Sequence, residues 1–196
     1  MKHTKQYRNN SIGLLEAYGL ESDLPIDIRK LASQLNINVN YENINKDISG
    51  KILFNPVDDK TTIIINNDEP EFRQRFSLAH EIAHYIYDID FNEYSEIEDT
   101  VTHFRKMSKD PIERRADKYA EKILMPAKIF REKAKEQKEA LLPNTGKSIG
   151  YKNIYKIVIT LSSMFNVSKP AIIYRLHSLK IINENTRRKL FDYHYL

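Results

Sequence analysis

The sequence predicts an α+β fold, in which a small antiparallel sheet comes first and most of the helices follow it. Three short segments between residues 37 and 65 are rich in residues that favour strands. Apolar residues then recur at helical spacing between residues 72 and 89, and again from residue 112 onward. The 196 residues suffice for one substantial core and a helical appendage. The clearest linker signal is Pro143-Asn144-Thr145-Gly146, so we divide the chain into a first domain, residues 1–142, and a C-terminal helical subdomain, residues 143–196.

The elements before residue 66 are expected to be short. We expect a helix at residues 11–18 and a second at residues 26–35, where the apolar residues keep helical spacing. Strands are expected at residues 37–41, where apolar and polar residues alternate, and at residues 51–55 and 61–65. The last two strands flank the turn sequence Pro56-Val57-Asp58-Asp59, which predicts a hairpin.

A long helix is expected from about residue 70. Asp68 is its expected capping side chain, Pro70 lies in its first turn, and Glu71 follows Asp68 by three residues. Apolar stripes cover most of its circumference, so the helix should be largely buried. We interpret the pattern as a buried helix whose single polar wedge lines a cleft. The alternative interpretation is a surface helix whose histidines are only solvated. The wedge holds Arg73, Gln74, Ser77, His80, Glu81, His84 and Asp88.

The residues His80 and His84 suggest a metal site, because side chains four apart on a helix stand about 5–6 Å from each other and can bind one cation together. Glu81 projects beside them, where it can take a proton from a water molecule on the metal. Zinc lowers the pKa of such a water to about 7, so a carboxylate can complete its activation at neutral pH. The pattern therefore predicts a metal-dependent hydrolase centre.

A catalytic zinc ion needs a third protein ligand. The chain has no cysteine, and Glu113, on a helix opened by Asp110-Pro111 and ended at Met125-Pro126, is the favoured candidate. A capping box would also place a glutamate there, three residues after Asp110. The cap does not explain Asp117, which shares an apolar stripe with Glu113 and would accept the second ring N–H of a ligand histidine. His103 is a rival third ligand in a polar, irregular stretch.

The chain resembles the ImmA/IrrE family of zinc peptidases, over roughly residues 20–182. The resemblance rests on residues 73–85 (RQRFSLAHEIAHY), 113–120 (ERRADKYA) and 124–126 (LMP), and it extends upstream to residues 24–28 and 49–50 and downstream to residues 165–168 and 175–176. It implies that His80, His84 and Glu113 bind the metal and that Glu81 is the general base. Family members typically cut helix-turn-helix repressors, including those that keep phages or mobile elements silent. The 28-residue connection between His84 and Glu113 departs from the family pattern.

We therefore expect a zincin-like metallopeptidase domain that holds one zinc ion per chain, with manganese or another divalent ion as the alternative. The expected function is a metal-dependent endopeptidase that cleaves a helix-turn-helix repressor of a phage or mobile element. The competing interpretation is a non-enzymatic anti-repressor or DNA-binding regulator that keeps the fold, but a pure binder has no need of a base at Glu81. Tyr85, His103 and Arg105 are candidate donors to the developing oxyanion.

The C-terminal subdomain is expected to contain two helices joined by a three-residue turn, with Ser168 capping the second, as in a helix-turn-helix. Between Asn166 and Leu190 there are six Lys or Arg and one Glu, a balance that suits DNA. However, the second helix uses Ile172, Ile173 and Leu176 for packing and offers few side chains that could read bases. We therefore favour a protein-docking or structural role over DNA.

Two further features concern location and charge. We find neither the apolar core of a signal peptide nor a stretch long enough to span a membrane, so we expect a cytoplasmic protein without a membrane partner. Six acids and no base occur between Asp88 and Thr100. This run is either a solvated loop or an acidic rim that attracts the basic face of a repressor.

Overall fold

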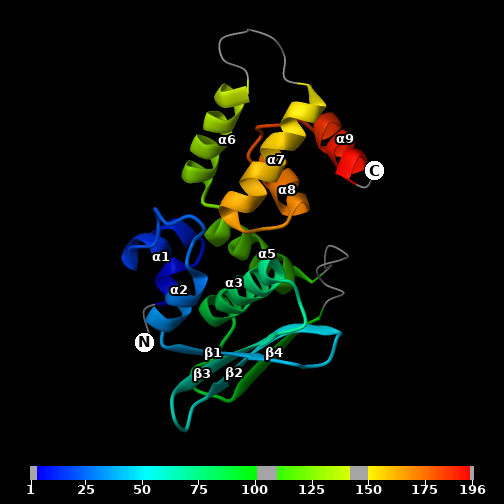
Figure 1. The fold of residues 1–196 in the computed structure, drawn as a ribbon. Coiled ribbons are helices and arrows are strands. Elements are labelled where there is room, and N and C mark those ends of the chain that lie inside the picture. Colours follow the sequence, from blue (N-terminus) through cyan, green and yellow to red (C-terminus); the bar gives the residue numbers. More distant parts are fainter. Residues whose placement is uncertain (1–3, 101–109, 142–149, 195–196) are drawn as a thin grey trace. The chain divides into compact units, whose positions relative to one another are not determined.

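The computed structural model describes residues 4–100, 110–141 and 150–194, and Figure 1 shows the fold. The chain forms two compact units, residues 1–124 and 125–196. The first unit holds the sheet and the helices that pack on it, and the second consists of helices. The α+β class expected from the sequence is confirmed.

The first unit begins with short helices. The 3-10 helix η1 (Thr4–Tyr7) precedes α1 (Ser11–Ala17) and α2 (Ile28–Gln34), which confirms the two helices expected in this region. Both α-helices are capped by side chains: Asn10 accepts a hydrogen bond from the backbone of Gly13, and Asp27 accepts one from Lys30.

A four-stranded sheet follows, with strand order β1-β3-β2-β4. Its strands are β1 (Ile37–Glu42), β2 (Ile48–Asn55), β3 (Lys60–Asn66) and β4 (Ser95–Thr100). The first three occupy the expected segments, whereas β4 lies where the sequence suggested only an acidic stretch. The hairpin of β2 and β3 and the β2–β4 pair are antiparallel, but β1 runs parallel to β3. The sheet is thus mixed rather than wholly antiparallel, because the hairpin places β3, not β2, beside β1.

The long helix α3 (Glu71–Tyr87) packs on β2 and β3 and against α5 (Pro111–Leu124), so that helices cover one face of the sheet (Figure 1). Inward-facing strand residues such as Ile52 and Ile63 are fully buried, as are Leu78 and Ile82 of the helix. Each such burial stabilises the fold by roughly 1.5–3 kcal/mol. This shared core fixes the position of α3 relative to the sheet.

The prediction that Asp68 caps the start of α3 was wrong. Pro70 is the N-cap residue and no side chain caps the helix. Asp68 instead lies in a turn, where its backbone N–H donates to Asn66 Oδ1 at 3.0 Å. The amide of Gln74 reaches back and donates to the carbonyl oxygen of Glu69 at 2.7 Å, so the segment before the helix is held by the first turn itself.

The second unit comprises α6 (Ala127–Leu141), α7 (Tyr151–Phe165), α8 (Lys169–Ser178) and α9 (Glu184–His194). The sequence-based boundary at residues 142–143 falls outside the described residues, and α6 belongs with the helices that follow it. The reason is packing across the linker, since the ring centroids of Phe130 and Phe165 are 5.2 Å apart. The buried guanidinium of Arg175 also donates to the carbonyl oxygen of Met125, at 3.0 Å from Nε and 2.6 Å from Nη2.

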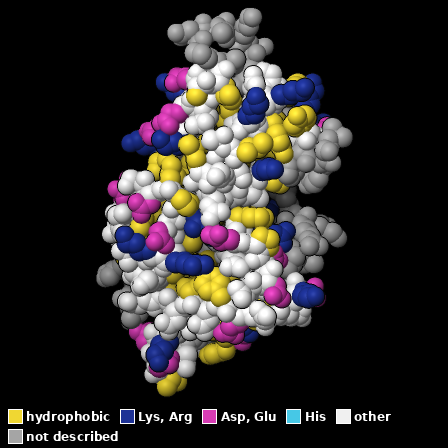
Figure 2. Space-filling model, in the orientation of Figure 1, with side chains coloured by type: hydrophobic (Ala, Val, Ile, Leu, Met, Phe, Trp, Pro, Cys, Tyr) yellow, Lys and Arg dark blue, Asp and Glu magenta, His cyan; other side chains and the backbone are white. Residues whose placement is uncertain are grey.

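The pair α7 and α8 has the expected helix-turn-helix form. Asn166 ends α7 in the left-handed conformation, and Ser168 caps α8 by accepting from the backbone of Ala171 at 3.3 Å. Residues 125–196 carry 14 Lys or Arg and five acids, a net charge of +9. In Figure 2, Lys and Arg side chains lie beside hydrophobic ones over the α7 and α9 part of this unit. Among the described residues, no single helix has the length and apolarity of a membrane span, and α7 and α8 meet that test only as a pair bent by 106°.

Candidate metal centre

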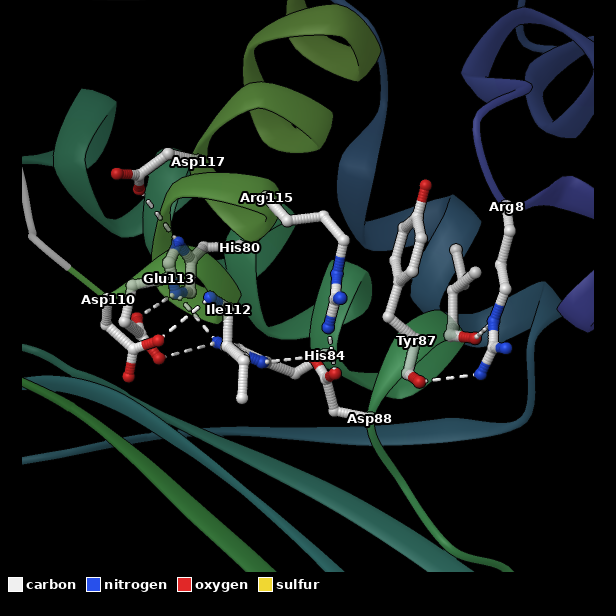
Figure 3. A network of polar contacts seen from close by, with 11 residues as sticks. Arg8, His80, His84, Tyr87, Asp88, Asp110, Ile112, Glu113, Arg115 and Asp117 are labelled. Atoms are coloured by element: carbon white, nitrogen blue, oxygen red, sulfur yellow. Dashed lines mark hydrogen bonds and ion pairs between the residues drawn. The ribbon is translucent and has the colours of Figure 1, made fainter.

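Two packed helices bring together a cluster of His80 and His84 from α3 and Glu113 from α5, as Figure 3 shows. The two imidazoles are fully buried and Glu113 is 6% exposed. The Nε2 atoms of the histidines are 2.9 Å apart. Glu113 Oε2 is 3.1 Å from Nε2 of His80, and Glu113 Oε1 is 3.5 Å from Nε2 of His84. One ligand atom from each residue therefore faces a common point, and these atoms all lie within 4.8 Å of one another.

The other nitrogen of each ring is held by a carboxylate. Nδ1 of His80 is 3.0 Å from Oδ1 of Asp117, and Nδ1 of His84 is 2.8 Å from Oδ2 of Asp88. An ionised carboxylate only accepts hydrogen bonds, so Nδ1 is the protonated nitrogen in both rings. When both rings are neutral, this tautomer leaves the lone pairs of both Nε2 atoms directed at the carboxylate of Glu113. The two nitrogen lone pairs and the carboxylate then repel one another unless a positive charge lies between them.

A divalent ion fits this arrangement. Zinc binds histidine nitrogen and carboxylate oxygen at about 2.0–2.2 Å, which puts the atoms of a tetrahedral set roughly 3.3–3.6 Å apart. The observed separations of 2.9, 3.1 and 3.5 Å are close to that spacing. Carboxylates behind both imidazoles are the usual outer partners of metal-binding histidines, because they fix the tautomer and raise the basicity of the ligand nitrogen. The buried His–His–Glu group could thus hold a metal ion.

The electrostatics also favour positive charge at the centre. Burial acts to lower the pKa of His84, but its hydrogen bonds with Asp88 and Glu113 outweigh burial and raise that pKa to about 9. Burial acts to raise the pKa of Glu113, yet its hydrogen bonds with His80 and His84 hold that pKa well below its usual range. The cluster therefore stabilises a carboxylate and a cation side by side.

Glu81 is fully buried and lies against the sheet. A Cβ atom placed on Gly50 of β2 would be only 3.2 Å from Glu81 Oε1 and 3.1 Å from Cδ1 of Ile65. The pairing of β2 with β4 is irregular between Ile48 and Gly50, so the strand is distorted at this point. The absence of a side chain at residue 50 lets β2 approach the helix closely enough to enclose the Glu81 carboxylate.

The contacts of Glu113 distinguish the ligand interpretation from the alternative, in which Glu113 is the glutamate of a capping box. Its carboxylate points to the two imidazoles. Asp110 caps the helix without it, because Asp110 Oδ1 accepts the backbone N–H of Ile112 at 2.9 Å. The position of Glu113 thus favours the ligand interpretation over the cap. Asp117, expected behind a ligand histidine, contacts His80.

Of the three candidate oxyanion donors, the structure describes only Tyr85, which does not join this cluster. His103 and Arg105 lie outside the described residues. Tyr85 is 2% exposed, and its ring packs edge-on against Phe91 with centroids 5.4 Å apart. Tyr85 also lines a small pocket with Tyr7 and Tyr18, away from the histidines.

Sequence reasoning missed two residues near the centre. Asp88 accepts from His84, and Arg115 forms an ion pair with Asp88. The four-residue spacing from His84 to Asp88 on one helix face was a signal that could have identified Asp88. Nothing local in the sequence marks Arg115, which reaches Asp88 from another helix. The acidic run from Asp88 to Thr100 is therefore not wholly solvated.

Two histidines and a glutamate that converge from packed helices, with a buried glutamate between the histidines in sequence, define a centre of the metallopeptidase type. The model of the family Peptidase_M78, described as the IrrE N-terminal-like domain, matches residues 32–177. The chain belongs to this family, and the expected resemblance is confirmed. A search of the curated proteins found no match.

Proposed function

We propose that this protein is a zinc-dependent endopeptidase whose substrate is a helix-turn-helix repressor in the cytoplasm. The observation that carries the proposal is the convergence of His80, His84 and Glu113 on one point, with a carboxylate behind each imidazole. Zinc suits two imidazoles and one carboxylate, and manganese is the principal alternative. Membership of a peptidase family supports the reaction class.

In the proposed mechanism His80, His84 and Glu113 would hold the ion. The ion would polarise the scissile carbonyl group and make a water molecule acidic enough to lose a proton near neutral pH. Glu81 accepts the proton of the attacking water and later donates it to the amine of the leaving fragment. Asp117 and Asp88 keep the two imidazoles in the tautomer that binds the ion. The close approach of β2 at Gly50 supports this role, because it would limit the movement of the Glu81 carboxylate.

The sheet offers a way to align an extended substrate. Within the described residues β4 is the last strand on its side, so its outer edge has hydrogen-bonding groups to offer. The backbone of Asp99 pairs with Gly50, which lies against Glu81. A peptide that adds to β4 as a further strand would be held through its main chain at the level of Glu81. This placement supports cleavage within a chain rather than removal of single terminal residues.

Charge supports a basic partner. Residues 1–124 carry 22 acids and 17 Lys or Arg, a net charge of −5. A helix-turn-helix repressor has a basic surface for phosphates. Opposite charge increases the association rate more than it increases affinity. Lys51 forms ion pairs with Glu96 and Glu98 of β4 at 3.2 and 3.4 Å, which reduces the acidic character on that face of the sheet.

The test is to incubate the purified, zinc-loaded protein with helix-turn-helix proteins, starting with any encoded by the genes next to its own, and to follow both by intact mass. We expect two fragments of the repressor whose masses sum to the intact mass plus one water. The variant Glu81→Gln should bind the repressor and leave it intact. A wild-type protein that binds the repressor in a stable complex without cutting it would overturn the enzymatic proposal and identify a binding anti-repressor instead.

A further inference from the structure

Asp88 is in an unusual position for an acid. It is the C-cap residue of α3, where the helix dipole places partial negative charge. A carboxylate at such an end is destabilising unless a cation compensates it. Its side chain is only 14% exposed, and one of its oxygens accepts from His84 Nδ1. The position therefore requires a nearby positive charge besides the histidine.

Arg115 of α5 supplies that charge. Its Nη2 donates to Asp88 Oδ1, the oxygen that His84 does not use. The guanidinium also lies over the ring of Tyr87, with 4.7 Å between its central carbon and the ring centroid. Its Nε is buried and has no hydrogen-bond partner among the residues that the structure describes. The carboxylate and the aromatic face together thus hold the guanidinium in place.

A second arginine supports the opposite side of the same ring. In Figure 3 the ring of Tyr87 lies between Arg115 and Arg8, whose central carbon is 5.7 Å from the ring centroid. Arg8 donates from Nε to the carbonyl oxygen of Ile86 at 3.1 Å and from Nη2 to that of Tyr87 at 2.6 Å. These bonds satisfy carbonyls that the end of α3 leaves without helical partners. The backbone N–H of Asn9 donates to the Tyr87 hydroxyl at 2.6 Å, so residues 8 and 9 clasp the end of the metal-site helix.

We propose that Arg115 is a positioning residue for the metal centre: it fixes the Asp88 carboxylate, which in turn orients the imidazole of His84. Tyr87, which Arg8 contacts on its other side, holds the guanidinium of Arg115 in the orientation in which it donates to Asp88. The N-terminal segment thereby supports a ligand that lies more than 70 residues further along the chain. The inference rests on the proposed metal site, because it concerns how one ligand is held for the ion.

A simple surface ion pair would behave differently. Arg115 is 40% exposed in its side chain, and an exposed pair of this kind contributes little to folding stability. Loss of such a pair would leave the affinity for metal unchanged. Loss of an outer partner of a metal-binding histidine, here Asp88, typically weakens metal binding by about 10–100-fold, and loss of the residue that fixes this partner should cost part of that affinity. Metal affinity, measured without any substrate, therefore distinguishes the two roles.

The experiment measures zinc affinity by competition with a chromophoric chelator, and the visible spectrum after loading with cobalt(II), in the full-length protein. Arg115→Met should weaken zinc binding by about 10-fold, the lower end of the loss expected for Asp88 itself, and shift the cobalt bands, because the carboxylate that orients the His84 ring is no longer fixed. Arg115→Lys, which restores the charge but not the planar fork, should recover most of the affinity. The matched control is Arg114→Met, which removes the exposed neighbouring arginine and should leave both readouts at wild-type values.

A double-mutant cycle tests whether Arg115 acts through Asp88. In the background of Asp88→Asn, the further change Arg115→Met should have little additional effect on zinc affinity, because the group that Arg115 holds is already altered. Fully additive losses would overturn the inference, as would unchanged affinity and spectrum in Arg115→Met. If Arg115→Met does not fold, Arg115→Gln takes its place in the same cycle. A wild-type protein that binds no zinc would instead overturn the proposed function itself.

Discussion

Replacing Gly50 with alanine should impair the reaction more than it impairs folding. The glycine lies in β2 at the point where the strand meets Glu81. Its backbone does not adopt a left-handed conformation, so an alanine can take the same φ and ψ without strain. The effect of the change is therefore that of one methyl group in a confined space.

The distances set the size of the effect. The new Cβ would be 3.2 Å from Glu81 Oε1 and 3.1 Å from Ile65 Cδ1, whereas ordinary contacts begin near 3.4 Å. Both atoms are at the ends of side chains, so each can yield by a few tenths of an ångström while the backbone stays in place. Overpacking costs about 1–3 kcal/mol, and the loss of chain entropy in the unfolded state offsets about 0.4–1 kcal/mol of it. A misplacement of 1 Å can cost about 100-fold in rate, so a smaller shift of the base should cost about 10-fold in kcat.

The assay compares kcat for repressor cleavage, zinc affinity and the midpoint of thermal unfolding in Gly50→Ala and in the control Gly150→Ala. Apart from its neighbours in the chain, no atom of the described residues lies within 4 Å of the position that a Cβ would take at Gly150. We expect Gly50→Ala to keep its zinc and remain folded while kcat falls about 10-fold. Cleavage by Gly50→Ala at the wild-type rate would refute the reasoning that the close approach of β2 confines Glu81. A loss of zinc in parallel with the loss of rate would also refute it.

Four further changes test the remaining parts of the centre and the C-terminal unit. The wild-type protein should bind about one zinc ion per chain, and metal analysis of His84→Ala should show that tight binding is lost. Titration of Glu113→Ala should show sharply weaker metal binding, whereas loss of a helix cap alone would lower stability by about 0.5–2 kcal/mol and leave the ion bound. Glu81→Gln should retain zinc and the fold in calorimetry but lose hydrolysis by at least about 100-fold, and undiminished cleavage would remove this residue from the mechanism. Binding to duplex DNA between about 50 and 200 mM salt should be weak, because α8 buries the side chains that would otherwise be available to read bases, namely Ile172, Ile173, Arg175 and Leu176. Sub-micromolar, sequence-selective binding would contradict this expectation if changing Arg187, Arg188 and Lys189 to alanine abolished it.

The parts of the centre that the sequence determined are those encoded by helical periodicity. His80 and His84 are one turn apart on a helix, so their spacing alone places two imidazoles on one face. Glu113 and Asp117 are also four residues apart, and the stripe that they share with Ala120 and Leu124 indicated that both would lie at the edge of the apolar face. The strands of the hairpin and the turn before α8 were likewise visible because their signals extend over only a few residues.

The tertiary structure decided the features that depend on residues far apart in sequence. The place of β3 between β1 and β2 follows from how the hairpin docks, which alternation within each strand does not specify. The acidic β4 has weak strand propensity and forms a strand through its pairing with β2. The contact of Gly50 with Glu81 requires α3 to pack on the sheet, and the link from Arg8 through Tyr87 to Arg115 spans 107 residues of the chain. Such contacts form only when separate apolar faces share one core, and no local pattern in the sequence records which polar side chains that packing brings together.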